Sequence, residues 1–322
     1  MTVAHHTNKV IITGPSHPLL AEGLRTLGYE VIDAPNITRE EVESIIDDAV
    51  GLVITTRVAV DRTLLQKAHQ LKWIGRLGSG MELVNTVYAQ ERGVTCYSSP
   101  EGNRLSVAEH ALGMLLTVLH RISWSYREIQ QGLWKRNENR GTELSGLCVG
   151  IIGYGNTGSE FARLLAPFGV TVLACDINKS GFGNSYIQEA SLAEVMARCQ
   201  VISFHVPLDA TTKGMADAAF FDSLQRAPLL INTSRGEVVD LKALVQALEK
   251  GQLSGAVLDV LPNENLASYQ PDENQLLQQL IQHPGVVLTP HIAGYSHASF
   301  ERMSQVLLNK IRSDTQGQRP AL

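Results

Sequence analysis

The chain has neither a long apolar run nor a dominant charge, and each absence excludes a class of protein. No hydrophobic stretch reaches the roughly 18 residues that a membrane-spanning helix needs, and the polar segment 1–9 lacks the apolar core of a signal peptide. The net charge is −5 without a long run of one sign, so sequence-independent nucleic-acid binding is not expected. We therefore expect a cytoplasmic protein with no nucleic-acid and no membrane partner.

Cysteine is scarce, which excludes a disulfide-stabilised scaffold. The four cysteines, Cys96, Cys148, Cys175 and Cys199, show no paired spacing along the chain. Three of them lie in or beside apolar runs, so buried, reduced thiols are the expectation. Cysteine and histidine do not cluster with the spacing of a zinc site, and we expect no metal.

Length and composition favour two globular domains. The chain has 322 residues, of which 44% are hydrophobic and 18% charged. Short apolar runs alternate with amphipathic stretches, which is typical of parallel sheets covered by helices. The first series of strands is predicted at Val10–Thr13, Glu30–Asp33, Leu52–Thr55, Trp73–Arg76 and Val94–Tyr97. The second is predicted at Cys148–Ile152, Thr171–Cys175, Val201–Phe204, Leu229–Asn232, Gly255–Asp259 and Val286–Leu288.

Helices are predicted between these strands. In the first series they are Leu19–Leu27, Glu41–Ile46 and Leu64–Ala68. One long helix, from about Leu105 to Gln131, separates the two series, and a last helix is predicted at His297–Ile311. The turn cluster Ser98–Asn103 marks the break between two α/β units. The six strands of the second series suit a doubly wound sheet.

A glycine loop follows the first strand of the second series. The order strand, Gly153-x-Gly155-x-x-Gly158, helix is the one that dinucleotide binding needs. The first glycine makes a tight turn, the second lets the backbone approach a pyrophosphate, and the third lets the helix pack on the strand. The helix N-terminus then offers N–H groups to the phosphates. The predicted loop consists of Gly153, Tyr154, Gly155, Asn156, Thr157 and Gly158.

An acidic residue ends the next strand. Asp176 lies 18 residues after Gly158. A carboxylate there accepts hydrogen bonds from both ribose hydroxyls and repels a 2′-phosphate, which favours NAD over NADP. The two residues that follow carry no positive charge, whereas Lys179 weakens the inference slightly.

Three polar residues follow later strands of the same unit. Arg235, Glu264 and His291 supply a cation, a carboxylate and a group that titrates near neutral pH. Hydride transfer to a carbonyl beside a carboxylate needs these chemistries: an anchor for the carboxylate and a proton donor whose pKa is held near neutrality. Taken singly, these residues are better explained as a surface arginine, a loop glutamate and a structural histidine.

A resemblance to a known family supports the interpretation of these three residues as one site. The chain resembles the D-isomer-specific 2-hydroxyacid dehydrogenases in seven segments, in that family's order and over nearly the whole chain. These segments are Gly75–Gly80, Pro100–His110, Gly141–Gly146, His205–Leu208, Asn232–Gly236, Leu258–Val260 and Pro290–Ile292.

The resemblance implies an NAD-dependent oxidoreductase of small 2-hydroxy and 2-keto acids. It implies catalytic roles for Arg235, Glu264 and His291, and contact of Asp259 with the nicotinamide amide. The other cofactor contacts that it implies, besides the glycine loop and Asp176, are His205, Pro207 and Thr233. The expected substrate contacts are Arg57, Ser79, Gly80, Asn103, Arg235 and His291.

The same resemblance implies the domain organisation. We expect an α/β protein of two doubly wound parallel-sheet, Rossmann-like domains with a cleft between them. Residues 1–99 plus 294–322 are expected to form a flavodoxin-like substrate-binding domain, and residues 100–293 the NAD-binding Rossmann domain. Family members are usually homodimers through the long helix and its neighbouring loop, here about 102–135.

The sequence departs from the family's pattern in two places. The proline that usually follows the catalytic glutamate is Asn265, and the loop Asn263–Gln275 is long and polar, so Glu264 is the least certain member of the triad. Glu82 stands where the family commonly has aspartate, a milder change.

The substrate is left open between two kinds of acid. The segment from Gln131 to Leu144 resembles the phosphoglycerate dehydrogenases of the family, and Arg136 is a candidate for meeting a phosphate across a dimer interface. However, Thr55 stands at the family's phosphate-binding arginine, with Arg57 two residues later. A smaller keto acid, such as hydroxypyruvate or glyoxylate, is therefore an alternative. A non-enzymatic NAD sensor, like the corepressors that resemble this family, is a second one.

Overall fold

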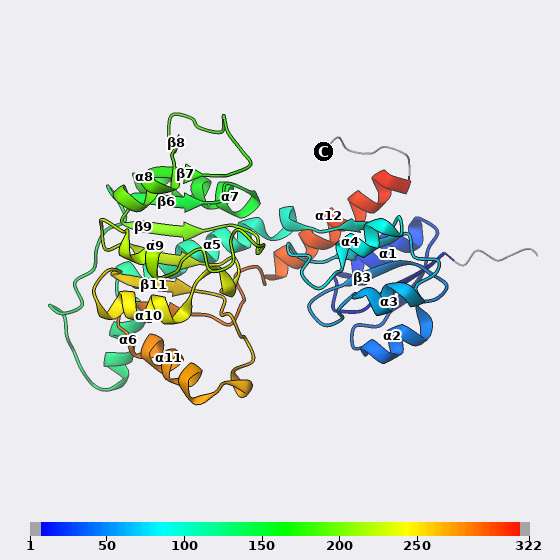
Figure 1. Ribbon diagram of the computed structural model, residues 1–322, viewed down its shortest axis with the longest axis horizontal. Coiled ribbons are helices and arrows are strands. Elements are labelled where there is room, and N and C mark those ends of the chain that lie inside the picture. Colours follow the sequence, from blue (N-terminus) through cyan, green and yellow to red (C-terminus); the bar gives the residue numbers. More distant parts are fainter. Residues whose placement is uncertain (1–7, 316–322) are drawn as a thin grey trace, which may run out of the picture. The chain divides into compact units, whose positions relative to one another are not determined.

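The computed structural model describes residues 8–315, which divide into two compact units. The first comprises residues up to Asn103 together with the segment from Tyr295, and the second comprises Arg104–Gly294. Each unit is a parallel β-sheet with helices on both faces (Figure 1). The predicted fold of two parallel-sheet α/β domains is confirmed in this respect.

The first unit is built on a five-stranded sheet in the order β2-β1-β3-β4-β5, which is flavodoxin-like. Its strands are β1 Lys9–Ile12, β2 Glu30–Asp33, β3 Ala49–Ile54, β4 Trp73–Arg76 and β5 Thr95–Tyr97. Its helices are α1 Pro18–Thr26, α2 Arg39–Ile45, α3 Arg62–Lys67, α4 Thr86–Glu91 and α12 His297–Thr315. Apolar residues of β1, β3 and β4 alternate between two cores, one against α2, α3 and α4 and the other against α1 and α12.

The second unit is built on a seven-stranded sheet in the order β12-β11-β10-β9-β6-β7-β8. Its strands are β6 Cys148–Ile152, β7 Thr171–Cys175, β8 Ile187–Glu189, β9 Val201–Phe204, β10 Leu229–Asn232, β11 Gly255–Leu258 and β12 Val286–Leu288. Numbered within the unit, this is the Rossmann order 3-2-1-4-5-6 with a seventh strand added. The strand order reverses between β6 and β9, and ligands of such sheets bind at the carboxyl ends of the strands at this point.

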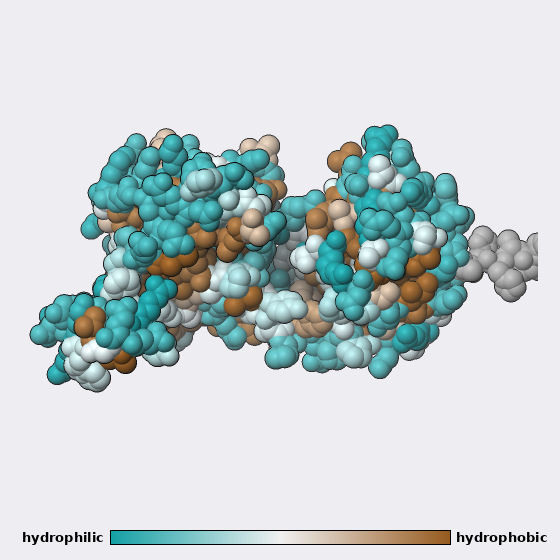
Figure 2. All heavy atoms as spheres, turned by 90° about the horizontal axis from the view of Figure 1, so that it is seen from below, coloured by the Kyte–Doolittle hydropathy of each residue, from teal (hydrophilic) through white to brown (hydrophobic). Residues whose placement is uncertain are grey.

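Helices cover both faces of this second sheet. They are α5 Pro100–Leu119, which begins in the first unit, α6 Ile122–Gln130, α7 Asn156–Leu165, α8 Leu192–Arg198, α9 Ala218–Asp222, α10 Leu241–Glu249 and α11 Pro271–Gln282. One core lies between the sheet and α8, α9 and α10, and the other between the sheet and α5 and α7. On the face shown in Figure 2, hydrophilic residues predominate and hydrophobic ones form smaller patches.

The structure corrects two predictions of secondary structure. The long helix predicted over 105–131 is two helices, because Arg121 adopts a left-handed conformation (φ 54°) that ends α5 and begins α6. The stretch 263–275, expected to be a long loop, contains a short 3₁₀ helix at Leu266–Ser268 and the first turn of α11. Among residues 8–315, we find no helix with the length and apolar character to cross a membrane.

Candidate active site

The three glycines of the loop after β6 have different surroundings. A Cβ on Gly158 would lie 2.1 Å from the Gly153 carbonyl oxygen, and one on Gly153 (φ 92°) would lie 2.6 Å from the His205 oxygen. Both positions therefore need glycine for close packing at the switch point. A Cβ on Gly155 would meet nothing within 4 Å. The open space beside Gly155 is where the loop can receive a pyrophosphate.

Two further observations fit a bound dinucleotide. Helix α7 begins at Asn156 without a side-chain cap from Gly155, so the N–H groups of its first turn can bind phosphate oxygens. The hydroxyl of Thr233, after β10, is buried and has no hydrogen-bond partner among the residues that the structure describes. A buried polar atom of this kind is normally satisfied, and a bound cofactor would supply the missing partner.

Asp176 is fixed at the end of β7. Its Oδ2 accepts from the Tyr154 N–H and its Oδ1 from the Asn178 N–H, both at 2.8 Å. Each oxygen retains acceptor capacity for a ribose hydroxyl. Lys179 donates to the Tyr154 carbonyl (3.1 Å), so the cation that weakened the NAD inference is bonded to the glycine loop.

His205 lies beneath the glycine loop. It is 8% exposed, with Nε2 at 2.8 Å from the Ser203 hydroxyl and Nδ1 at 3.2 Å from the Thr157 hydroxyl. Burial lowers the pKa of His205 to about 3, so the ring is neutral at physiological pH. The ring therefore holds Thr157 in the first turn of α7. Pro207, two residues on, is exposed and accepts from the Thr212 hydroxyl through its carbonyl (2.6 Å).

The loop after β10 positions Arg235. The buried Asn232 side chain accepts from the Ser234 N–H (3.0 Å) and donates to the Arg235 carbonyl (2.8 Å), which fixes the turn. A Cβ on Gly236 would lie 2.0 Å from the Leu261 carbonyl carbon. The loops after β10 and β11 are therefore in backbone contact.

His291 and Glu264 are brought together by the loops after β12 and β11. The distances from His291 Nδ1 to Glu264 Oε1 and Oε2 are 2.8 and 3.0 Å, and each side chain is 48% exposed. An ionised carboxylate only accepts, so Nδ1 carries the proton and donates. The loop that carries Glu264 is closed on itself by a hydrogen bond from the Tyr269 hydroxyl to the Asn263 carbonyl (2.6 Å). Asn265 therefore does not prevent the pairing.

A buried carboxylate supports the backbone on which His291 stands. Asp259 is 1% exposed and accepts from the Thr289 hydroxyl (2.6 Å), the Ile292 N–H (2.9 Å) and the Ala293 N–H (2.8 Å). His291 itself has φ 55°, a left-handed conformation that is costly for a non-glycine residue. Successive N–H groups in such a turn form a concave anion site, here filled by Asp259.

Helix α5 anchors the same turn. The Ser106 hydroxyl donates to the Ala293 carbonyl (2.8 Å), and His110 Nε2 lies 3.0 Å from the Thr289 hydroxyl oxygen. Because the Thr289 hydroxyl gives its proton to Asp259, His110 is the donor to Thr289. Sequence reasoning missed Ser106 and Thr289, since their hydroxyls carry no motif of their own.

The remaining predicted substrate contacts belong to the first unit. The Ser79 hydroxyl donates to Asn103 Oδ1 (3.1 Å), and Gly80 follows in the same turn after β4. Arg57 is exposed and donates to the Pro35 carbonyl and to Asn36 Oδ1, the latter at 3.3 Å. Thus Ser79, Gly80 and Asn103 cluster, whereas the Arg57 side chain contacts the segment after β2.

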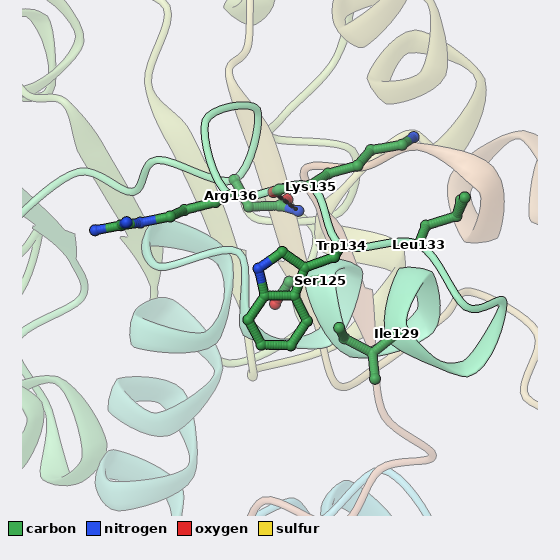
Figure 3. Close-up of a pocket in the computed structure, with 7 residues that line it drawn as sticks. Ser125, Ile129, Leu133, Trp134, Lys135 and Arg136 are labelled. Atoms are coloured by element: carbon green, nitrogen blue, oxygen red, sulfur yellow. Dashed lines mark hydrogen bonds between the residues drawn. The ribbon is translucent and has the colours of Figure 1, made fainter.

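The segment predicted to mediate dimerisation exposes large hydrophobic side chains in α6 and the loop after it. Exposure reaches 84% for Trp134 and 62% for Tyr126. A hollow of about 340 Å³ lies here (Figure 3), and it is lined by Ser125, Ile129, Leu133, Trp134, Lys135, Arg136 and Asn139. In Figure 3 the Lys135 and Arg136 side chains extend in opposite directions.

The cysteines differ from the sequence expectation. All four are free thiols, but only Cys199 is fully buried, and Cys96, Cys148 and Cys175 are partly buried. Cys148 and Cys199, which have no paired spacing in the sequence, are in contact. Within residues 8–315 no group of three or more His, Cys, Asp or Glu side chains has the arrangement of a metal site.

The second unit combines a Rossmann sheet, an open glycine loop, an acidic residue after the second strand and a His–Glu pair at the ends of later strands. This combination is typical of NAD-binding oxidoreductases. The profile described as "D-isomer specific 2-hydroxyacid dehydrogenase, NAD binding domain" matches residues 112–293, more than half of the chain. The chain belongs to the D-isomer-specific 2-hydroxyacid dehydrogenase family. The predicted family and NAD cofactor are thereby confirmed.

Two differently named dehydrogenases are similar to this chain over most of its length. D-3-phosphoglycerate dehydrogenase of Sus scrofa is 30% identical over 299 residues, which are 92% of this chain and 54% of that protein. Erythronate-4-phosphate dehydrogenase of Bacteroides fragilis is 34% identical over 302 residues, 91% of this chain and 77% of that protein. The chain thus spans about half the length of the mammalian relatives it matches.

Solved structures are similar in fold. The D-lactate dehydrogenase of Aquifex aeolicus, in complex with NAD and lactic acid, is 27% identical, with a TM-score of 0.82 and coverage of 97% of this chain and 96% of that chain. A glyoxylate reductase structure at 23% identity has a TM-score of 0.85 and supports the fold alone.

Proposed function

We propose that the chain catalyses NAD-dependent hydride transfer between a D-2-hydroxy acid and its 2-keto acid. The observation that carries this proposal is the hydrogen bond between His291 Nδ1 and Glu264 (2.8 Å) in the unit that holds the glycine loop. Glu264 orients the ring and stabilises its imidazolium form, which leaves Nε2 to exchange a proton with the substrate oxygen. When NAD is bound, its nicotinamide ring accepts or gives the hydride.

Arg235 anchors and polarises the substrate in this proposal. Its guanidinium presents a planar fork that binds both oxygens of a carboxylate. Asn232 fixes the backbone of its loop from a fully buried position, so the fork is presented from a defined turn. Ser79 and Gly80 are proposed to contribute backbone N–H groups to the carboxylate, with Asn103 holding the Ser79 hydroxyl.

Asp259 is proposed to support the site in two ways. The resemblance assigns it to the nicotinamide amide, and its three hydrogen bonds hold the turn that carries His291. The carboxylate is 1% exposed, so its position is set by these internal bonds. Residues 1–99 plus 294–322 and residues 100–293 are the proposed substrate and NAD domains.

The substrate that we propose is a phosphorylated D-2-hydroxy acid, with D-3-phosphoglycerate as the first candidate. Support comes from the named relatives, two of which act on phosphorylated acids. Arg57 and Arg136 are the proposed phosphate contacts. Two observations favour the smaller acids hydroxypyruvate and glyoxylate instead. Thr55 stands where the family has an arginine, and the Arg57 guanidinium already binds Pro35 and Asn36.

A homodimer through residues 102–135 is also part of the proposal. An exposed tryptophan beside exposed Ile122, Tyr126 and Ile129 is unusual for a surface that stays in water. A second copy of the chain would cover these side chains and bring Arg136 toward the partner's substrate. Light scattering behind size-exclusion chromatography measures the mass, and a monomer at micromolar concentration contradicts this part.

The test is a substrate panel with a matched pair of variants. Turnover is followed by NADH absorbance with D-3-phosphoglycerate, hydroxypyruvate and glyoxylate, each with NAD and NADP cofactors. His291→Ala is expected to lower kcat by about 100-fold or more. His69→Ala, an exposed histidine of the first unit that likewise contacts a carboxylate, Asp47, is the control and leaves kcat unchanged. Full activity of His291→Ala refutes the assignment, and tight NADH binding without turnover of any acid favours the NAD sensor.

A further inference from the structure

Two thiols meet at the edge of the NAD-binding unit that lies opposite the glycine loop. Cys148 is the first residue of β6, and Cys199 caps the carboxyl end of α8. Their sulfur atoms are 3.3 Å apart although the residues are 51 positions apart in the chain. The glycine loop follows the other end of β6, so this pair is not part of the site described above.

The pair is held in place by the backbone around it. The Gln200 N–H donates to the Cys148 carbonyl (2.9 Å), and the Cys148 N–H donates to Gln200 Oε1 (2.8 Å). Gly150 leaves room for the second thiol, because a Cβ there would lie 3.0 Å from Cys199 Sγ. These contacts fix both residues, and a disulfide of about 2.05 Å then requires the sulfurs to approach by little more than 1 Å.

The two thiols differ in reactivity. Cys148 is partly exposed, and the hydrogen bond from the Cys199 thiol lowers the pKa of Cys148 to about 7, with the charge of Arg198 acting in the same direction. Cys199 is fully buried, and both the Cys148 sulfur and burial raise its pKa. Burial also raises the pKa of Cys96, and that of Cys175 to about 11. Cys148 is therefore the thiol that becomes a nucleophile near neutral pH.

We propose that Cys148 and Cys199 form a reversible disulfide when the protein meets a peroxide, with Cys148 oxidised first and Cys199 resolving. Cys148 first loses its proton to solvent, and the thiolate attacks one peroxide oxygen; an S–O bond forms, the O–O bond breaks, and the released hydroxide takes up a proton from solvent to become water. The Cys199 sulfur then attacks the Cys148 sulfur; the S–S bond forms, the S–O bond breaks, and hydroxide leaves with the Cys199 proton. Two electrons pass from the thiols to hydrogen peroxide, which becomes two waters.

The disulfide would close a covalent loop of the chain that contains proposed cofactor-binding elements. Residues 148–199 contain the glycine loop, α7 and Asp176, that is, the whole half of the Rossmann sheet that binds the adenosine side of NAD in the proposed function. Oxidation would thus tie the start of β6 to the end of α8 and lock this half covalently. The inference rests on the thiol contact alone and does not depend on the substrate.

The experiment uses the full chain and hydrogen peroxide as the oxidant. After treatment at pH 7, free thiols are blocked by alkylation and the protein is digested without reductant for mass spectrometry. The expected product is one linked pair of peptides containing Cys148 and Cys199, two hydrogen masses lighter than their sum and lost after dithiothreitol. Cys199→Ser is expected to lose the link and to accumulate a sulfenic acid at Cys148 that dimedone traps. Cys96→Ser is the matched control and keeps the link.

Two outcomes overturn the proposal. In the first, Cys148 and Cys199 remain fully alkylated after peroxide in the folded protein. In the second, Cys148 links to Cys96, to Cys175 or to a second chain instead of Cys199. Circular dichroism of each serine variant verifies that it is folded, and Arg198→Gln, which leaves both thiols in place, is expected to slow the link several-fold.

Discussion

Replacing Asp259 with asparagine tests how the turn that presents His291 is held. The carboxylate receives two donors on Oδ1, the Thr289 hydroxyl and the Ile292 N–H, and one on Oδ2, the Ala293 N–H. An asparagine can keep the Oδ1 pair, but its NH₂ group then faces the Ala293 N–H. The buried Ala293 donor is left without an acceptor, and the two remaining bonds lose their charge-assisted strength.

The magnitude follows from counting these groups. An unsatisfied buried N–H costs about 1–3 kcal/mol, and reducing two charge-assisted bonds to neutral ones adds about 1 kcal/mol in this buried site. Asp259→Asn is therefore expected to destabilise the unit Arg104–Gly294 by roughly 2–4 kcal/mol. For a unit of this size the melting temperature should fall by roughly 5–15 °C. Turnover should fall as well, because His291 loses the support of its left-handed backbone.

Differential scanning calorimetry measures the change in melting temperature. Hydrogen exchange of the Ile292 and Ala293 amides measures the loss of local stability in the turn. The matched control is Asp240→Asn. Asp240 is exposed and accepts from the Ala243 N–H as the N-cap of α10, a position where asparagine is equally good. A shift below about 2 °C for Asp259→Asn, together with unchanged amide protection, would refute the reasoning.

Two other predictions rest on single contacts. Gly158→Ala places a Cβ 2.1 Å from the Gly153 oxygen, so the Kd for NADH should rise about tenfold or more in a fluorescence titration. The control is Gly113→Ala, whose Cβ meets nothing within 4 Å and which should leave this Kd unchanged. His205, with a folded pKa of about 3, binds a proton only on unfolding between pH 3 and pH 6.5, so its contribution to stability is complete above pH 6.5 and is lost as pH falls. Between pH 8 and pH 5 the wild type should lose about 2 kcal/mol more unfolding free energy than His205→Gln in urea titrations, and equal losses in both proteins would contradict this sign.

The strands of the Rossmann unit could be predicted from the sequence because they are buried on both faces. Runs such as Val201–Phe204 and Leu229–Asn232 match β9 and β10 to the residue. The short edge strand β8, Ile187–Glu189, was missed, because a three-residue strand with two exposed side chains has no apolar run. The break at Arg121 was missed for a different reason: a non-glycine residue adopts a left-handed conformation only when tertiary contacts impose it.

Side-chain partners were harder to predict than strands. Glu264 was the least certain residue of the triad because the chain after it departs from the family's pattern, yet the structure pairs it with His291 at 2.8 Å. The contact between Cys148 and Cys199 has no signal in the sequence, since it depends on how α8 packs on β6. Such pairs follow from packing between elements, which periodicity does not encode.

The loops after β10, β11 and β12 follow the same positional pattern, and this pattern is visible in the sequence. In each loop the residue at or just after the strand end is polar and its side chain holds the turn: Asn232 and Asp259 are fully buried, and Thr289 donates to Asp259. The residue assigned to the proposed triad lies two to five positions later, as Arg235, Glu264 and His291 do. A side chain at the strand end is fixed by the sheet, whereas one further out reaches solvent and ligand. A polar residue that ends a buried strand therefore marks the support of a site, and the reacting group should be sought a few residues beyond it.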